Sequence, residues 1–210
     1  MNATNLLFSM ADQLRFDALG YVTPSFTTPH LDQLAAEGIN FQRAYSSTPT
    51  CTPARAALLT GRSPWGHGML GYGKVADHYP FEYPRELEKA GYTLAVAGKD
   101  HWGWNKTAGV VGGVRHGFDE LHVYDGSEDQ PDQYTTWFRQ QTNGSEPERC
   151  FPALDHNSWR GAANVCEERP LPSAWTARPA VAFLEGPADP GVGGPPPLLL
   201  QGSCRACAVP

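Results

Sequence analysis

The sequence predicts an α/β fold, a layered arrangement in which helices flank a largely parallel central sheet. Over residues 1–125, short apolar runs that suit buried strands alternate with helical segments that carry their own start and stop residues. This alternation is typical of parallel sheets, because two parallel strands need a crossover that a helix can supply. A chain of 210 residues is long enough to bury a core by itself.

The first strand is expected over residues 5–11, which form a nearly continuous apolar run. A helix follows from Thr28 to Gly38, where Thr28 can cap, Pro29 suits the first helical position and Gly38 suits the stop. Residues 39–45 alternate in polarity and predict a short strand.

Further along the chain, a second helix is expected from about Pro53 and a third from Pro84 to Ala90. Residues 93–97 suit another buried strand. A helix over 175–184 is expected to be kinked or shortened by Pro179. Residues 198–200 suit one last strand, and no regular structure is expected over residues 202–210.

Composition divides the chain into two parts. Residues 1–185 form one expected domain, in which the polar segment 125–165 is an irregular insertion. Glycine and proline dominate residues 186–210, so this part is expected to be an aberrant or truncated carboxyl end.

Net charge and hydropathy exclude some partners. The net charge of −6 argues against nucleic acid, which usually meets a basic surface. No run reaches the ~18 apolar residues of a membrane span, and the first residues lack a secretory signal. The sequence as written therefore predicts a cytoplasmic protein, or a secreted or lysosomal one if residues precede Met1.

The five cysteines do not have the spacing of a disulfide framework. Cys204 and Cys207 form a single C-x-x-C pair at the chain end, without the context of a redox or zinc site.

Asp12 and Gln13 follow the first expected strand. Their carboxylate and amide oxygens suit calcium or magnesium better than zinc. The same residues also suit an ordinary turn with Gln13 in solvent, and the spacing alone favours that interpretation.

Cys51 stands at the start of the second expected helix, and Arg55 follows one turn later. A helix start offers unpaired amides and a positive dipole end, which favour an oxyanion and a reactive thiolate. The alternative is a cysteine that is simply a small buried hydrophobic residue.

Lys99 and His101 leave the end of the strand at 93–97 together. They could hold a tetrahedral anion and move a proton, or they could belong to a solvated loop. Jointly, the three segments hold the groups needed to cleave an anionic ester: oxygen ligands, a nucleophile, two cations and a histidine.

These residues resemble the type I sulfatase family. The run from Cys51 to Arg55, C-T-P-A-R, with L-T-G-R over 59–62, resembles that family's C-x-P-x-R signature and its threonine–glycine–arginine tail. Residues 5–20 resemble the family's first strand and metal-binding turn, and residues 98–103 resemble its G-K-W-H-L-G element. The resemblance covers about residues 4–125 and implies an alkaline-phosphatase-like fold, with residues 1–185 as the N-terminal part of a sulfatase domain.

The resemblance implies an arylsulfatase-like sulfuric ester hydrolase, which cleaves a sulfate ester to an alcohol and sulfate. In this family a formylglycine-generating enzyme oxidises the signature cysteine, here Cys51, to formylglycine, and the hydrated aldehyde attacks sulfur. By position, Arg55 would steady the diol, Lys99 would bind sulfate oxygens and His101 would assist proton transfer.

The resemblance also implies a divalent cation, calcium first and magnesium or manganese as alternatives, held by Asp12, Gln13 and the modified Cys51. The implied substrate is a sulfated small molecule or a sulfated glycan. Gln13 stands where many relatives have a second aspartate, and the family's phosphonate monoester and phosphodiester hydrolases also accept glutamine. Such a hydrolase is therefore the second interpretation.

The chain also departs from the family pattern. Family members are usually more than twice as long and supply further metal ligands and a further sulfate-binding lysine downstream. We therefore expect an incomplete, inactive fragment with an exposed sheet edge at 93–97 or 198–200. A non-catalytic pseudo-sulfatase is the third interpretation.

Overall fold

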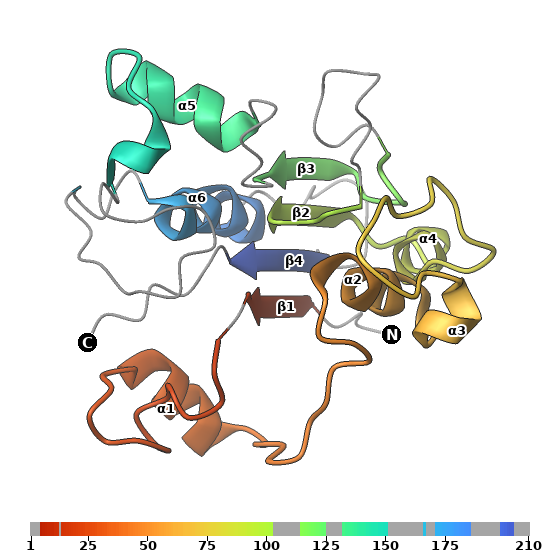
Figure 1. The fold of residues 1–210 in the computed structure, drawn as a ribbon, viewed down its shortest axis with the longest axis horizontal. Helices are drawn as coiled ribbons and strands as arrows, with labels where there is room; N and C mark the ends of the chain where they lie inside the picture. The colour runs from red at the N-terminus through yellow and green to blue at the C-terminus, as the bar shows by residue number, and fades with distance from the viewer. Residues whose placement is uncertain are drawn as a thin grey trace.

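The computed structural model describes residues 5–12, 14–102, 114–124, 132–150, 166, 171–185 and 198–203 (Figure 1). Met1, Gln13, Cys204 and Cys207, which the sequence analysis names, lie outside the described residues.

The core of the structure is a four-stranded sheet in the order β1-β4-β2-β3. The strands are β1 (Leu6–Ala11), β4 (Leu198–Ser203), β2 (Leu94–Gly98) and β3 (Glu120–Val123), and every neighbouring pair is parallel (Figure 1). The predicted parallel sheet is confirmed. The predicted edge is wrong, because β4 and β2 lie inside the sheet while β1 and β3 form its edges.

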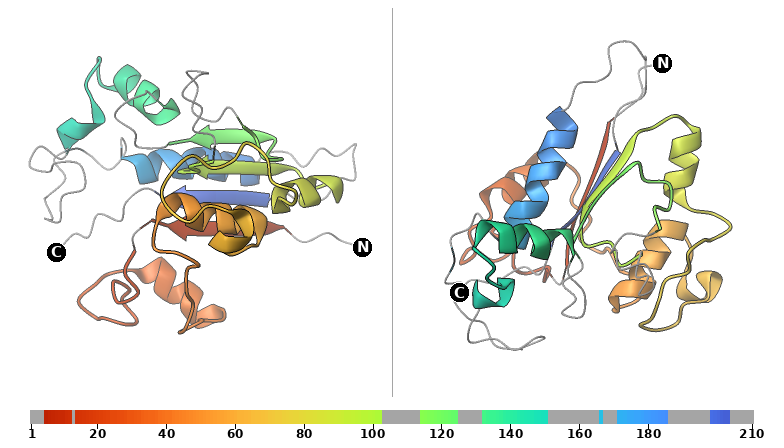
Figure 2. Two further views of the ribbon diagram at one scale, coloured as in Figure 1. Left: turned by 45° about the vertical axis from the view of Figure 1, so that its right-hand side comes forward. Right: turned by 90° about the horizontal axis from the view of Figure 1, so that it is seen from above.

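Strand β2 is buried on both faces, which explains its unbroken run of small and apolar residues. Leu94 and Val96 pack into the cluster that contains Ala56 and Leu59 of helix α2 (Cys51–Thr60). Ala95 and Ala97 face the other way and pack against α6 (Pro172–Glu185). Figure 2 shows α6 on one side of the sheet and α2, α3 and α4 on the other.

The predicted helices form with small shifts. They are α1 (Pro29–Glu37), α2, which begins at Cys51 and not at Pro53, and α4 (Tyr83–Lys89); a further short helix, α3 (Pro64–His67), follows α2 directly. Helix α2 ends at Gly61, whose φ of 65° is left-handed and whose N–H donates to the Ala57 carbonyl. Helix α6 runs through Pro179 and is longer than predicted.

Two predictions for the apolar segments are wrong. Residues 39–45 form no strand, and Phe41 is 77% exposed, because no strand of the described residues pairs with this segment. Strand β1 was expected to be buried, yet Leu7 is 57% exposed. An edge strand has a neighbouring strand on one side only, so a continuous apolar run does not by itself show that the strand is buried.

The segment 125–165 was expected to be irregular, and part of it is helical. Helix α5 (Gln133–Gln141) is capped by Asp132, whose side chain accepts from the Thr135 N–H at 2.7 Å. A 3₁₀ turn, η1 (Pro147–Cys150), follows, and Cys150 forms a disulfide with Cys166. The sequence analysis did not anticipate this bond. Cys150 packs against Tyr134, and the disulfide closes this small satellite core.

Across the described residues, no helix combines the length and the apolar character that crossing a membrane would require.

A buried ion-pair network at Glu82 holds α4 against the segment before β3. The Glu82 carboxylate is fully buried, accepts from the Tyr79 N–H at 2.8 Å and from Arg85 Nε at 2.6 Å, and lies 3.1 Å from His116 Nδ1. Burial by itself raises the pKa of Glu82, but the bonds from Tyr79, Arg85 and His116 outweigh it and hold that pKa below its ordinary value.

We expect Glu82→Gln to lower the free energy of unfolding by about 1–3 kcal/mol at neutral pH, because one buried acceptor loses its charge. The depressed pKa means that the unfolded chain binds more protons, so this stabilisation is present above the unfolded pKa of Glu82 and disappears as the pH falls through the folded pKa. Urea denaturation of the unchanged protein and of Glu82→Gln, from neutral pH down through the folded pKa of Glu82, measures the difference in the free energy of unfolding. Equal stabilities at neutral pH would show that the network contributes nothing.

Candidate active site at the carboxyl edge of the sheet

The carboxyl ends of β1 and β2 bring two of the predicted segments together. Asp12 follows β1, Lys99 follows β2, and the strand between them is β4. Lys99 Nζ donates to Asp12 Oδ2 at 2.6 Å, although the two residues are 87 positions apart. Both side chains are largely shielded, with 14% of Asp12 and 16% of Lys99 exposed.

Helix α2 adds the third segment. Arg55 Nη2 lies 3.9 Å from Asp12 Oδ2, and Arg55 Nη1 donates to the Lys99 carbonyl. Cys51 is the first residue of α2 and is half-buried, with a free thiol. Residues four apart share one face of a helix, so Cys51 is on the same face of α2 as Arg55, one turn closer to the helix start.

The cations keep Asp12 ionised. Burial by itself raises the pKa of Asp12, but the hydrogen bond from Lys99 and the charges of Lys99, Arg55 and His101 outweigh it. The pKa of Asp12 is therefore below its ordinary value, and the carboxylate is ionised at neutral pH.

His101 lies in the turn that leaves β2. It is 8% exposed and has a φ of 57°, a left-handed backbone conformation that is uncommon for a residue with a side chain. When protonated, His101 lowers the pKa of Asp12, so His101 lies near the carboxylate that Lys99 and Arg55 approach.

Trp102 and Thr52, to which the sequence analysis gave no role, form hydrogen bonds that hold α2 in position. The Trp102 indole N–H donates to the Arg55 carbonyl at 3.1 Å, and its ring stacks on Phe118 with centroids 5.6 Å apart. Thr52 Oγ1 accepts from the Gly73 N–H at 3.2 Å. Trp102 directly follows His101 and stands where the family's G-K-W-H-L-G element has leucine, so a large apolar residue at this position was the available signal.

The carboxylate of Asp12 fits a hard cation, since it is ionised, half-buried and next to the start of α2. Within the parts of the chain that the structure describes, no three histidine, cysteine, aspartate or glutamate side chains gather into a metal site. Gln13, the second predicted ligand, lies outside those parts.

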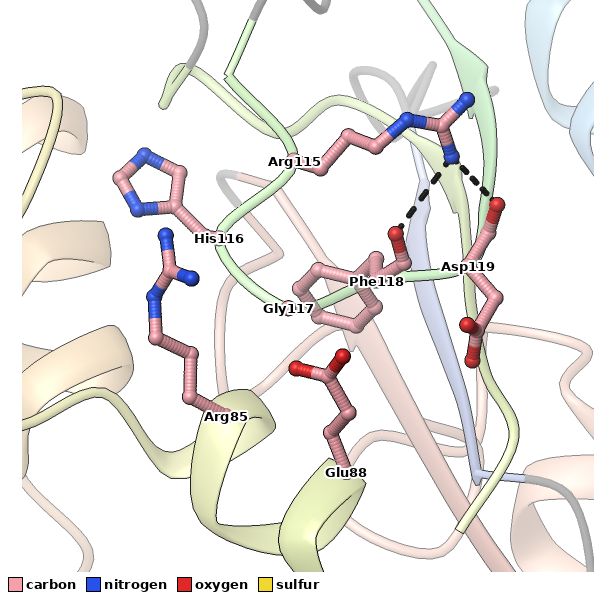
Figure 3. Close-up of a pocket in the computed structure, with 7 residues that line it drawn as sticks. All are labelled: Arg85, Glu88, Arg115, His116, Gly117, Phe118 and Asp119. Atoms are coloured by element: carbon pink, nitrogen blue, oxygen red, sulfur yellow. Dashed lines mark hydrogen bonds between the residues drawn. The ribbon is translucent and has the colours of Figure 1, made fainter. Parts of the chain in front are cut away.

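A pocket of about 340 Å³ lies at the opposite edge of the sheet (Figure 3). Its lining residues are Arg85, Glu88, Arg115, His116, Gly117, Phe118 and Asp119. The Asp119 N–H bonds the Leu94 carbonyl at the start of β2, so this pocket is at the amino ends of the strands. Arg115 is turned onto the carbonyls of Phe118 and Asp119, as the dashed lines in Figure 3 show. The pocket is therefore separate from the cluster around Asp12.

Comparison with known proteins identifies the family to which this chain belongs. The sulfatase family model matches residues 4–165. The chain belongs to the sulfatase family. The resemblance seen in the sequence is confirmed, and the match extends past residue 125 into the segment of α5.

Sequence relatives are sulfatases of bacteria and mammals. The chain is 33% identical over 198 residues to an arylsulfatase of Clostridium perfringens, which covers 86% of this chain and 39% of that protein. It is 39% identical over 132 residues to the steryl-sulfatase of Mus musculus, covering 56% of this chain and 21% of that protein. The chain thus spans less than half the length of these relatives.

Solved structures show the same fold. The chain superposes on the phosphonate monoester hydrolase of Agrobacterium radiobacter with a TM-score of 0.69 and 20% identity, covering 95% of this chain and 40% of that one. A sulfatase from Pseudoalteromonas sp. gives a TM-score of 0.62 with 24% identity, covering 99% of this chain and 45% of that one. The predicted alkaline-phosphatase-like layered fold is confirmed.

Replacing Asp12 tests whether the cluster stabilises the fold. We expect Asp12→Asn to lower the free energy of unfolding by about 1–3 kcal/mol, because it removes the one charge that both Lys99 and Arg55 approach in a shielded site. The matched control is Asp17→Asn, which removes a carboxylate from an exposed pair with Arg15 and should change stability little. Chemical denaturation of the unchanged protein and of the two variants measures the free energy of unfolding. Equal losses for Asp12→Asn and Asp17→Asn would show that the shielded cluster stabilises the fold no more than an exposed pair does.

Proposed function

We propose that this chain carries part of the active site of a sulfuric ester hydrolase, which cleaves a sulfate ester to an alcohol and sulfate. The observation that carries the proposal is the cluster in which Asp12, Arg55 and Lys99 meet beside the start of α2. Membership of the sulfatase family and relatives named arylsulfatase and steryl-sulfatase support it.

In this proposal Cys51 is the site of formylglycine, which supplies a hydrated aldehyde as nucleophile. The first turn of α2 favours an anion at this place, because its backbone N–H groups and dipole present positive charge. Thr52 and Arg55 hold that turn through their bonds to Gly73 and to the Lys99 carbonyl.

The charged side chains have separate roles. Arg55 and Lys99 bring two positive charges to the place where the sulfate oxygens would lie, and fixed charges of this kind stabilise the charge that develops during transfer. His101, next to them, would hold or move a proton.

A divalent cation, calcium first, would be held by Asp12, Gln13 and the modified Cys51. When bound, such a cation supplies charge neutralisation and lowers the pKa of a coordinated hydroxyl. The ionised Asp12 carboxylate supports this assignment.

A phosphonate monoester or phosphodiester hydrolase on the same scaffold is less well supported. The likeness to the Agrobacterium radiobacter enzyme is at 20% identity, which concerns the fold alone, whereas the reported sequence relatives are sulfatases.

The proposed substrate is a sulfated small molecule or a sulfated glycan, and the proposed partner is a formylglycine-generating enzyme. An ulvan-active sulfatase of Formosa agariphila, 43% identical over 131 residues and matching 60% of this chain and 25% of that protein, supports the glycan. The Cys150–Cys166 disulfide supports folding in an oxidising compartment, which favours the secreted or lysosomal interpretation over the cytoplasmic one.

Conversion of Cys51 tests the proposal directly. When the chain is co-expressed with a formylglycine-generating enzyme, we expect mass spectrometry to find formylglycine in the peptide that contains Cys51. Arg55→Ala should prevent this conversion, because it destroys the C-x-P-x-R motif. An unmodified Cys51 peptide in a culture that converts a known sulfatase would count against the proposed function.

Calcium binding tests the metal assignment. We expect calcium to raise the melting temperature of the chain, since a ligand that binds only the folded state at about 100 times its Kd contributes about 2.7 kcal/mol. Asp12→Asn should lose most of this shift, while Asp17→Asn should keep it. Equal calcium shifts in all three proteins would remove Asp12 from the ligand set.

A further inference from the structure

The turn after α5 holds a three-residue motif that the proposed function does not use. Asn143, Gly144 and Ser145 read N-G-S. An asparagine followed two positions later by serine or threonine, with no proline between them, is the acceptor motif for N-linked glycosylation. The same motif begins at Asn2 and at Asn105, but both lie outside the described residues. Asn143 is therefore the acceptor asparagine whose surroundings the structure describes.

The turn is held by bonds that do not involve the Asn143 side chain. The Gly144 N–H donates to the Arg139 carbonyl at 2.8 Å, and Ser145 Oγ donates to the Thr142 carbonyl at 3.0 Å. In the part of the chain that the structure describes, no hydrogen bond or ion pair uses the side chain of Asn143. A group attached to this side chain would therefore break none of the contacts that shape the turn.

The tip of the turn is open to solvent. Asn143 is exposed and has a φ of 54°, a left-handed conformation that asparagine tolerates better than most residues. Gly144 is also exposed, and a side-chain carbon placed on it would meet no atom within 4 Å, its chain neighbours aside. A bulky group at Asn143 therefore has room outside the fold.

The base of the turn is fixed to the small core that contains the disulfide. Phe138 is fully buried in the cluster that includes Cys150. Across the turn, Arg139 Nε donates to Glu146 Oε1 at 3.0 Å. The Cys150–Cys166 bond is typical of oxidising compartments such as the lumen of the endoplasmic reticulum. That lumen is also where eukaryotic cells transfer N-linked oligosaccharides, so the disulfide and the motif point to the same compartment.

We propose that Asn143 is an N-glycosylation site, which carries an oligosaccharide on the exposed turn between α5 and η1. The donor is a lipid-linked oligosaccharide whose first sugar, an N-acetylglucosamine, is bonded to a lipid pyrophosphate. The side-chain nitrogen of Asn143 forms a bond to the anomeric carbon of this sugar and gives up one proton. The bond between that carbon and the pyrophosphate oxygen breaks, and the lipid pyrophosphate leaves. Nothing is oxidised or reduced in this transfer.

The position of α5 makes this inference independent of the proposed function. In Figures 1 and 2, α5 lies next to β3 at one edge of the sheet, and α2 is well separated from it in every view. A glycan on the turn after α5 would therefore leave the start of α2, where Cys51 lies, uncovered.

Mass spectrometry of one peptide tests the proposal. The full 210-residue chain is secreted from a eukaryotic host behind an added signal peptide. Trypsin releases residues 140–149 as one peptide, in which Asn143 is the only asparagine. Peptide N-glycosidase in water enriched in heavy oxygen converts a glycosylated asparagine to a labelled aspartate. We expect most of this peptide to carry the label, and a digest without the glycosidase to show little, which controls for spontaneous deamidation of the Asn-Gly pair.

Variants are compared by the mass of the intact glycopeptide. Asn143→Asp should abolish the glycopeptide and keep the turn, because aspartate also tolerates the left-handed conformation. Ser145→Ala should abolish it although Asn143 remains, and Ser145→Thr should keep it because the hydroxyl of the motif is retained. Thr142→Ala is the matched control. It removes the bond from Thr142 Oγ1 to the Phe138 carbonyl but leaves the motif intact, so the glycopeptide should remain.

The outcomes separate the two proposals. An unlabelled peptide in a culture that glycosylates a secreted reference protein would overturn the assignment of Asn143. Equal labelling with and without the glycosidase would overturn it too, because deamidation alone would then explain the label. A glycopeptide that survives Ser145→Ala would exclude the motif as its cause. A glycan at Asn143 in a protein whose Cys51 resists the formylglycine-generating enzyme would support this inference and count against the proposed function alone.

Discussion

The hydrogen-bonded ion pair between Lys99 and Asp12 is the contact on which the site depends. It ties the turn after β1 to the turn after β2, across the end of β4, and both side chains are largely shielded from solvent. Arg55 joins the same carboxylate and the Lys99 carbonyl, so helix α2 is fixed to the sheet at the turn that begins with Cys51. Without the Asp12 carboxylate, the positive charges of Arg55 and Lys99 would lie close together with no opposite charge between them.

The hydrophobic layers under the site explain why this contact can form. Strand β2 presents Leu94 and Val96 to α2 and presents two alanines to α6, so it is buried between helices on both sides. The Trp102 ring, stacked on Phe118, carries its indole N–H to the Arg55 carbonyl and links this core to the first turns of α2. The position of helix α2 therefore follows from apolar packing, while its orientation follows from a few polar bonds.

Some features of the fold could not be read from local patterns. The alternation of residues 39–45 suggested a strand and the apolar run of β1 suggested burial, yet residues 39–45 form no strand and β1 is largely exposed. Burial depends on which neighbours cover a segment, and local patterns do not contain that information. The Cys150–Cys166 bond had no signal in the spacing of the cysteines, because a disulfide depends on how the segments after α5 approach each other.

The sequence by itself determined the parallel α/β class, the helix starts at Pro29 and near Cys51, and the residue types of the candidate site. These features rest on local chemistry: helix start and stop residues, apolar runs and the short C-T-P-A-R run at Cys51. Only the tertiary structure decided that β4 separates β1 from β2, that Lys99 bonds Asp12, and that Trp102 and Gly73 hold the start of α2. Such contacts join residues far apart in the chain, so they exist only after the layers have packed and cannot be read from spacing along the sequence.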